Sequence, residues 1–240
     1  MAPTPTIRLD AAALATTSPI LPHQQAAWNW LQEQLTTPQV AEFAELFRAG
    51  PAVVPPVAQV IPAGPPVWPP GMAGPKIRPS LATGDHHLIA NDICETMTAW
   101  THDGRKLWTI PCLCRGQGDD TEWQTPQTDT PPGLYRVGSV WRDYERLGDN
   151  PSVVPAELVP YGWFTLDLEE MEGQERRYGR AGICIHGGGS SLGARGSWQP
   201  LQPLVPTWGC PRVHNVHLRD KIVPLLKSGA VWVSVLQEAG

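Results

Sequence analysis

The chain has no run of apolar residues long enough to cross a bilayer, so we expect no transmembrane segment. It also lacks an excess of basic residues, since 18 Lys and Arg stand against 23 Asp and Glu and the formal net charge is −5. That balance excludes the electrostatic footprint of a nucleic-acid-binding protein. Residues 1–25 lack the charged and apolar regions of a secretory signal, and we expect no signal peptide there. The 27 prolines and 23 glycines favour turns and extended segments over a helical bundle.

Cysteine is scarce, and its spacing bears on metal binding and disulfide formation. Five cysteines leave at least one unpaired. Cys112 and Cys114 alternate along an expected strand and share one face, but no second Cys/His cluster at zinc spacing accompanies them. We therefore interpret them as ordinary strand cysteines and expect no metal ion. A hairpin turn at Asp103-Gly104 would place Cys94 near this pair, which leaves a cross-strand disulfide open.

Composition divides the chain into three regions. Residues 1–49 form an N-terminal extension, in which residues 23–48 carry apolar side chains at helical spacing. Helices this short cannot bury their apolar faces alone, so they pack on the rest of the chain, on themselves or on a docking partner. Residues 50–80 are rich in proline, which is typical of a semi-rigid linker or strap. Residues 81–240 then form the third region, a separate predicted domain.

The last region predicts a mainly β domain with one packed helix. The candidate strands are residues 88–90, 94–100, 106–114, 133–140, 163–168, 181–186 and 230–236. A helix is expected over residues 215–227, with Asn215 as its cap. Its inward-facing residues are predicted to be Val216, Ile222, Leu225 and Leu226.

Two segments carry the residues suited to chemistry. Residues 183–187 place His186 at the end of an apolar strand, and residues 207–212 place Cys210 in a tight Gly-Cys turn. This is the sequence form of a Cys-His nucleophile pair. A cysteine reacts as its thiolate, and a neighbouring imidazole stabilises that anion. We therefore predict Cys210 as the nucleophile and His186 as its base.

The turn around the cysteine suggests how charge is stabilised. Gly209 lets the backbone bend so that the amides of Trp208, Gly209 and Cys210 point at a developing oxyanion. Thr207 supports the turn through a side-chain hydrogen bond. The structural alternatives are a buried small hydrophobe at Cys210 and a satisfied strand histidine at His186. The flanking residues favour catalysis.

The order and content of these segments resemble the L,D-transpeptidase catalytic domain, the family often called YkuD-like. Its pattern is a strand ending in His-Gly, a loop, and then Ser/Thr-His-Gly-Cys followed by an apolar residue and Arg or Asn. His186-Gly187 matches the first half, and the second half is mostly matched by Thr207, Gly209, Cys210 and Arg212. The likeness extends to Thr130-Pro131-Pro132-Gly133-Leu134-Tyr135, to the predicted hairpin and to the C-terminal end, and it covers roughly residues 84–238.

The sequence departs from the family pattern at three places. Trp208 stands where a second histidine is usual, Pro211 replaces an aliphatic residue, and the loop that precedes Cys210 is longer. A Gly-rich start and a Pro-rich return suit a lid, so we expect this loop to close over the thiol, with Arg195 or Trp198 reaching the substrate. The alternative is a surface excursion that touches nothing.

The resemblance implies a β-sandwich or barrel and a role for each matched residue. The Gly187 carbonyl orients the imidazole of His186, and the guanidinium of Arg212 contacts substrate, for which a carboxylate is a suitable partner. The implied substrate is a peptidoglycan stem tetrapeptide, whose bond to its terminal D-alanine is attacked by Cys210. D-alanine leaves, protonated by His186, and a thioester remains.

The same resemblance implies two fates for the thioester. An amine of a neighbouring stem resolves it to a 3→3 cross-link, and water resolves it as carboxypeptidase action; neither needs a cofactor or a metal. Such a substrate implies a place in the periplasm or cell wall. Two alternatives stay open. A phage or phage-tail cell-wall hydrolase with the same site would explain the missing signal sequence, and a non-catalytic wall-binding module gains weight from Trp208.

Overall fold

The computed structural model describes residues 66–118, 122–189 and 196–239, all of which belong to one compact unit. Nine strands form a single sheet in these residues. They are β1 (Met72–Ala73), β2 (His86–Asn91), β3 (Thr96–Thr101), β4 (Lys106–Leu113), β5 (Gly133–Trp141), β6 (Thr165–Glu170), β7 (Cys184–His186), β8 (Arg212–Val213) and β9 (Val231–Glu238). The short helices are α3 (Asp143–Leu147), η2 (Ala156–Leu158), α4 (Gln174–Arg177), α5 (Asn215–His217), η3 (Leu218–Ile222) and η4 (Val223–Lys227).

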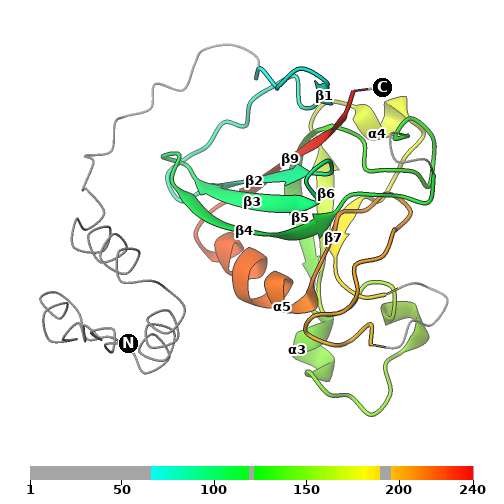
Figure 1. Cartoon of the computed structure of the whole chain (residues 1–240). Coiled ribbons are helices and arrows are strands. Elements are labelled where there is room, and N and C mark those ends of the chain that lie inside the picture. The colour runs from blue at the N-terminus through cyan, green and yellow to red at the C-terminus, as the bar shows by residue number, and fades with distance from the viewer. Residues whose placement is uncertain (1–65, 119–121, 190–195, 240) are drawn as a thin grey trace, which may run out of the picture. The chain divides into compact units, whose positions relative to one another are not determined.

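The sheet closes into a barrel (Figure 1). The strand order is β1-β9-β2-β3-β4-β8-β7-β6-β5, and β5 also pairs with β9, so the strands from β2 to β9 form a ring with β1 at its edge. β2 runs parallel to β9 and β7 parallel to β8, while the other pairs are antiparallel. The predicted fold class, mainly β with a packed helix, is confirmed.

Alternating burial explains why these strands close around one core. Successive side chains of a strand point to opposite faces. In β2 and β9 the alternate residues Leu88, Ala90, Val231, Val233 and Val235 are fully buried. The remaining core side chains of the barrel include Met97, Ala99, Ile110, Tyr135, Leu166, Ile185 and Val213. The hydrophobic alternation of the sequence therefore supplies the inner face of the barrel.

The helical segment predicted over residues 215–227 is present, although it is not one regular α-helix. It begins as α5, widens to a π-helix in η3 and ends as a 3-10 helix in η4. Pro224 lies near the start of η4 and has no backbone N–H to continue the α-helical pattern. Leu218, Ile222 and Val223 are buried in the barrel core, and Figure 1 shows the segment running beneath β2–β4.

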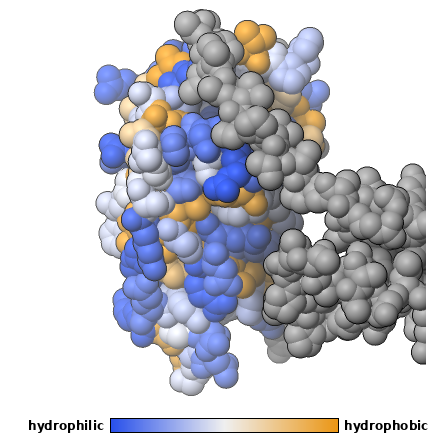
Figure 2. All heavy atoms as spheres, turned by 90° about the vertical axis from the view of Figure 1, so that its left-hand side faces the viewer, coloured by the Kyte–Doolittle hydropathy of each residue, from blue (hydrophilic) through white to orange (hydrophobic). Residues whose placement is uncertain are grey.

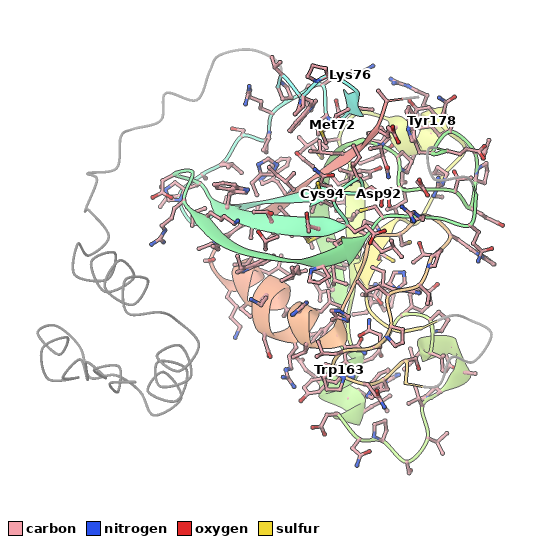
Figure 3. All side chains as sticks on the ribbon, in the orientation of Figure 1. Met72, Lys76, Asp92, Cys94, Trp163 and Tyr178 are labelled. Carbon is pink, nitrogen blue, oxygen red and sulfur yellow. The ribbon has the colours of Figure 1, made fainter. Side chains whose placement is uncertain are left out.

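The hairpin predicted at Asp103-Gly104 joins β3 to β4, with Gly104 at φ 83°. The cross-strand disulfide left open by the sequence is absent, because all five cysteines are free. Cys94 is exposed at the turn between β2 and β3, where Figure 3 shows it beside Asp92. The strands β1 and β8 were not expected, since a strand of two residues is too short to show a period.

The last part of the proline-rich region lies along the barrel. β1 pairs with β9, and the indole of Trp68 donates to the carbonyl of Pro75 at 2.9 Å. Met72, Lys76 and Tyr178, labelled in Figure 3, line a cavity of 480 Å³ beside this segment. The predicted helices of residues 23–48, and the proline-rich region up to residue 65, lie outside the described residues. The domain boundaries stay predictions.

The surface of the barrel is mixed in character. On the face shown in Figure 2, hydrophilic side chains predominate and apolar side chains stand between them. In the part of the chain that the structure describes, no helix has both the length and the apolar character needed to cross a membrane.

Candidate active site

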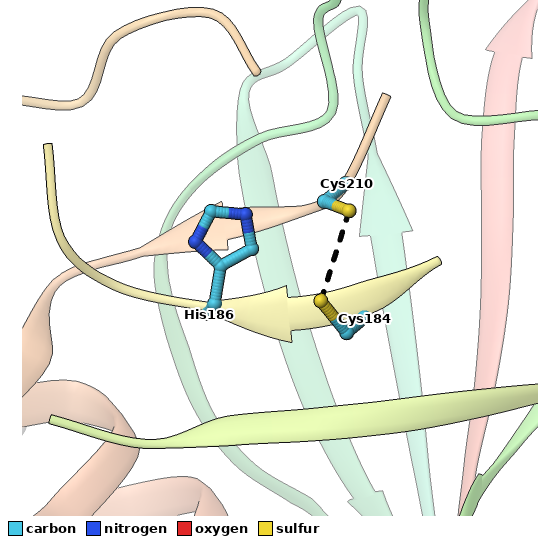
Figure 4. Close-up of side chains that lie close together, drawn as sticks. All are labelled: Cys184, His186 and Cys210. Carbon is cyan, nitrogen blue, oxygen red and sulfur yellow. Dashed lines mark hydrogen bonds between the residues drawn. The ribbon is translucent and has the colours of Figure 1, made fainter. Parts of the chain in front are cut away.

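Two neighbouring parallel strands bring the predicted nucleophile and base together. His186 ends β7 and is the register partner of Arg212 in β8, so Cys210, two residues before Arg212, lies beside the start of β7. The ligand atoms of Cys184, His186 and Cys210 all lie within 4.8 Å of one another (Figure 4). The two sulfur atoms are 3.7 Å apart. A parallel pair of short strands therefore assembles two thiols and an imidazole at one end of the barrel.

The imidazole of His186 is held in one orientation. Its Nδ1 lies 2.9 Å from the carbonyl oxygen of Gly187, the contact that the family resemblance implies. Because a carbonyl only accepts, Nδ1 carries a proton there, and Nε2 is the nitrogen that can exchange a proton with Cys210. Figure 4 shows one ring nitrogen turned toward Cys210 and the other turned away. The ring of Tyr161 packs against the imidazole with centroids 5.3 Å apart, and the Tyr161 carbonyl accepts from the amide of Gly187 at 2.9 Å.

The cysteine turn is organised by Thr207. Its Oγ1 donates to the carbonyl of Cys210 at 2.8 Å and accepts from the amides of Gly209 and Cys210 at 2.9 and 2.7 Å. The sequence predicted these two amides as oxyanion donors, but in the structure they are directed at Thr207. Trp208 is 61% exposed and lies at the rim of the site. The hydroxyl of Thr207 thus fixes the turn and occupies the donors that an oxyanion would use.

Arg180 is a supporting residue that sequence reasoning missed. Its buried guanidinium donates to the carbonyl of Trp208 at 3.0 Å and to those of Thr128 and Asp129 at 3.2 and 2.9 Å. Gly209, at φ 101°, passes so close that an added Cβ would lie 1.5 Å from Arg180 Nη2. The glycine is needed for both its positive φ and this close approach. No local sequence pattern predicts the supporting role of Arg180, because its hydrogen-bond partners lie far from it in the sequence.

Arg212 lies at the site, but its guanidinium faces the protein. It is 2% exposed and donates to the backbone carbonyls of Val205, Gly189 and Pro160 at 2.8, 2.9 and 3.3 Å. Burial lowers the pKa of Arg212 to about 10. These bonds tie the connection between β5 and β6 to both limbs of the connection between β7 and β8. The substrate contact implied by the resemblance stays a prediction.

Trp198, one of the two predicted lid residues, is placed differently from expectation. Trp198 is 7% exposed and belongs to the core cluster. The prediction that it reaches over the thiol is therefore wrong. Its indole donates to the carbonyl of Gly148 at 2.9 Å, and its own carbonyl accepts from the indole of Trp163 at 2.8 Å. A large apolar ring gains more by burial here than by standing over an open cavity. Arg195 lies outside the described residues.

Asn215 connects the loops of the site. It does not cap the helix, although the sequence predicted it as the cap. The cap position is His214, and Asn215 is fully buried. Its side chain accepts from the amides of Trp163 and Gly188, both at 3.2 Å. It also donates to the carbonyls of Ser197 and Gln199, both at 2.8 Å. A single amide side chain therefore joins the loop after β7 to the loop that returns to the cysteine.

The two thiols have opposite electrostatic settings. The pKa of Cys210 is held well below its usual range by the hydrogen bond from Cys184 and then by the hydrogen bond and charge of His186, although burial opposes this. The pKa of Cys184 is raised by its hydrogen bond with Cys210 and by burial. Of the two thiols, Cys210 is therefore the more readily ionised, with Cys184 as its hydrogen-bond donor. Cys184 could have been found from the sequence, because it alternates with His186 along one strand and so shares its face.

Two cavities flank the thiol pair, and Tyr161 lines both. The smaller has a volume of 160 Å³ and is lined by Gln117, Pro160, Tyr161, His186, Gly189, Pro206, Thr207, Trp208, Cys210 and Arg212. The larger has a volume of 420 Å³ and is lined by Trp141, Asp143, Arg146, Glu157, Leu158, Tyr161, Thr165, Asp167, Gly182 and Cys184. Cys210 lines the smaller cavity, and Cys184 lines the larger one together with the carboxylates of Asp143, Glu157 and Asp167.

Comparison with known proteins gives likenesses of fold only. No protein-family model matches the sequence. No curated protein matches it either. Among solved structures, the helical cell shape determining protein Pgp2 from Campylobacter jejuni matches 65% of this chain at 18% identity and a TM-score of 0.41.

Two further matches are L,D-transpeptidases, the family that the two sequence segments resemble. L,D-transpeptidase 1 from Mycobacterium tuberculosis matches 63% of this chain at 14% identity and a TM-score of 0.32. The enzyme from Xylanimonas cellulosilytica matches 67% at 17% identity and a TM-score of 0.33. The chain spans about half of the length of Pgp2 (48%), and 62% and 65% of the two transpeptidase chains.

Proposed function

We propose that the protein is a cysteine acyltransferase of the L,D-transpeptidase type, which acts on peptidoglycan stem tetrapeptides. One observation carries the proposal. Cys210 and the Nε2 side of His186 face each other at the wall of a 160 Å³ cavity, with Nδ1 fixed by the Gly187 carbonyl. This is the arrangement of a nucleophile, a base and a third group that orients the base.

The reaction proceeds in two steps. The thiolate of Cys210 attacks the carbonyl carbon of the diamino-acid residue, whose bond to the nitrogen of D-alanine then breaks. Nε2 of His186, which has taken the proton of the Cys210 thiol, delivers it to the leaving amine, and a thioester remains. In the second step an amine or a water attacks the thioester carbonyl, His186 takes its proton, and the thiolate of Cys210 is restored. The chain's own side chains supply every proton transfer in this scheme.

The larger cavity suits the second substrate. It lies beside Cys184 and is lined by Asp143, Glu157 and Asp167, with Arg146 as its one guanidinium. An ammonium group of a neighbouring stem is attracted by such an excess of carboxylates. We assign this pocket to the attacking amine and the smaller pocket to the donor stem. With peptidoglycan as its substrate, the protein acts at the cell wall, outside the cytoplasmic membrane.

The proposal is tested by incubating the purified full chain with disaccharide-tetrapeptide and analysing the products by mass spectrometry. The buffer contains a reducing agent and a metal chelator. We expect release of D-alanine together with a thioester-linked or cross-linked product. Cys210→Ala should give neither, and Cys94→Ser is the matched control, since Cys94 is exposed at the far turn.

The products also separate the related activities. A cross-linked dimer shows transfer, and a tripeptide stem alone shows hydrolysis by water. Wild-type protein that binds the stem without releasing D-alanine would contradict the proposed enzyme and favour a wall-binding module.

A further inference from the structure

Cys184 forms no bond to the substrate and transfers no proton in the proposed acyl transfer, yet its thiol contacts the nucleophile. Its side chain is 4% exposed and its sulfur lies 3.7 Å from that of Cys210. Together with His186 these residues offer three ligand atoms within 4.8 Å of one another. Within residues 66–118, 122–189 and 196–239 this is the one such group of three. A buried second thiol beside a reactive one therefore needs a separate explanation.

The separation of the sulfurs matches that of two thiolates on a tetrahedral zinc ion. Zn–S bonds of about 2.3 Å at the tetrahedral angle place two sulfurs about 3.8 Å apart. The observed distance is 3.7 Å, so the thiols need no rearrangement to bind such an ion. A tetrahedral site also requires about 3.6 Å between the imidazole nitrogen and each sulfur. These distances are at most 4.8 Å in the structure, so the imidazole would have to move by no more than about 1.2 Å.

The imidazole has the second contact that metal-binding histidines require. Such histidines donate the remote ring N–H to a carboxylate or backbone carbonyl, which fixes the ring and its tautomer. His186 does this through Nδ1 to the Gly187 carbonyl at 2.9 Å. Gly187 is itself confined, since an added Cβ would lie 2.0 Å from Asn215 Oδ1. The ligand is thus held on a rigid support before any ion arrives.

We propose that Cys184, His186 and Cys210 form a three-ligand site for Zn²⁺ or a similar borderline-soft divalent cation. Binding displaces the proton of Cys184 and the proton that Cys210 shares with Nε2 of His186, so both sulfurs coordinate as thiolates and the imidazole through its free Nε2. The fourth position opens to the 160 Å³ cavity, where a water molecule completes the tetrahedron. With its electron pair on the metal, Cys210 cannot attack an acyl carbon, so the bound ion blocks the site. Only this blocking effect rests on the proposed function.

A disulfide between Cys184 and Cys210 is the alternative to metal binding, and it fits the observations less well. The sulfurs would have to approach from 3.7 Å to about 2.05 Å, and the fixed imidazole would take no part. The pair formed by Cys112 and Cys114 has sulfurs at a similar 3.9 Å but belongs to no group of three. The site for a cation is therefore expected at Cys184 and Cys210 alone.

Zinc itself is the probe for the experiment. The full chain, reduced and stripped of metal, is titrated with Zn²⁺ against a chromophoric chelator, and with Co²⁺ while thiolate-to-metal absorption is recorded. We expect one equivalent to bind to wild type and to the control Cys94→Ser, with the absorption of a tetrahedral thiolate site. Cys184→Ser should weaken binding at least about 10-fold, since loss of a ligand costs no less than loss of an outer contact, which costs about 10–100-fold. His186→Gln, the second variant, should also weaken it.

Three results would overturn the proposal. They are wild type that binds no ion, Cys184→Ser that binds as tightly as wild type, and a chain whose mass falls by two hydrogens in place of ion binding. Because binding is measured without substrate, these outcomes are independent of any acyl transfer. The blocking effect is read separately: zinc should stop acylation of wild type, and the rate of Cys184→Ser should be the same with and without zinc.

Discussion

Two pairs of thiols stand at nearly equal separations in this barrel. The sulfurs of Cys184 and Cys210 are 3.7 Å apart, and those of Cys112 and Cys114 are 3.9 Å apart. The first pair lies between two cavities with an imidazole beside it, whereas the second is fully buried in the core. The pKa of Cys210 is lowered, chiefly by the hydrogen bond from Cys184, and that of Cys114 is raised, chiefly by the hydrogen bond that its thiol donates to Cys112. Proximity of sulfur alone does not make a reactive site; access and a fixed base do.

The largest expected effect is a loss of covalent reactivity at one pair only. A carbapenem, whose strained lactam mimics the scissile amide, should acylate wild type on Cys210. Cys210→Ala should abolish the adduct, and Cys112→Ala should retain it, because the core sulfur is fully buried. Intact-mass measurement reads both variants. An adduct that persists in Cys210→Ala would contradict the assignment of Cys210 as the reactive cysteine.

The second effect tests the imidazole of His186, which lies beside only one of the two thiol pairs. His186→Ala should slow acylation by about 10²–10⁴-fold, the range of general-base contributions. The matched control is His87→Gln, since His87 lies in β2 and bonds to Ser234 Oγ at 2.7 Å, away from any thiol pair. Rates measured by stopped-flow at fixed pH decide the matter. An equal rate in wild type and His186→Ala would make His186 a structural residue.

His87 gives a third effect, on stability. Burial lowers the pKa of His87 to about 4, from 6.5 in the unfolded chain. Between pH 6.5 and pH 4, His87 is protonated in the unfolded chain and neutral in the folded chain. Stability is therefore complete above pH 6.5 and is lost as pH falls toward 4, by up to about 3 kcal/mol.

The measurement for His87 is urea unfolding of wild type and of His87→Gln at pH 7 and pH 4.5. Glutamine keeps a hydrogen-bonding group near Ser234 and cannot titrate. The variant should lose less stability than wild type over this interval. Equal losses in both proteins would show that His87 is protonated in the folded state.

The smallest effect belongs to the core sulfurs. Cys112→Ala removes a fully buried atom and leaves a small cavity, so unfolding should become easier by about 1–2 kcal/mol. Cys94→Ala, at an exposed turn, should change stability by less than about 0.5 kcal/mol. Thermal unfolding compares the two. A shift for Cys94→Ala as large as that for Cys112→Ala would mean that burial does not set the cost of losing a sulfur here.

Local patterns in the sequence determined most of the barrel. Alternation along residues 86–113 and 231–238, and the Asp-Gly turn between β3 and β4, correspond to strands and a hairpin in the structure. Period and turn chemistry act over a few residues, so they can be read without knowing the fold. The two-residue strands β1 and β8 could not be read in this way, although β8 pairs with β7 and so brings Cys210 to His186.

Cys210 and His186 could be identified as site residues before folding was considered, because each lies in a short motif with its own local signature. The contact of Cys184 with Cys210, the burial of Arg212 among carbonyls and the place of Trp198 in the core depend on the folded barrel. Once the strands from β2 to β9 close into a ring, side chains distant in sequence compete for the same interior, and burial and hydrogen bonding choose among them.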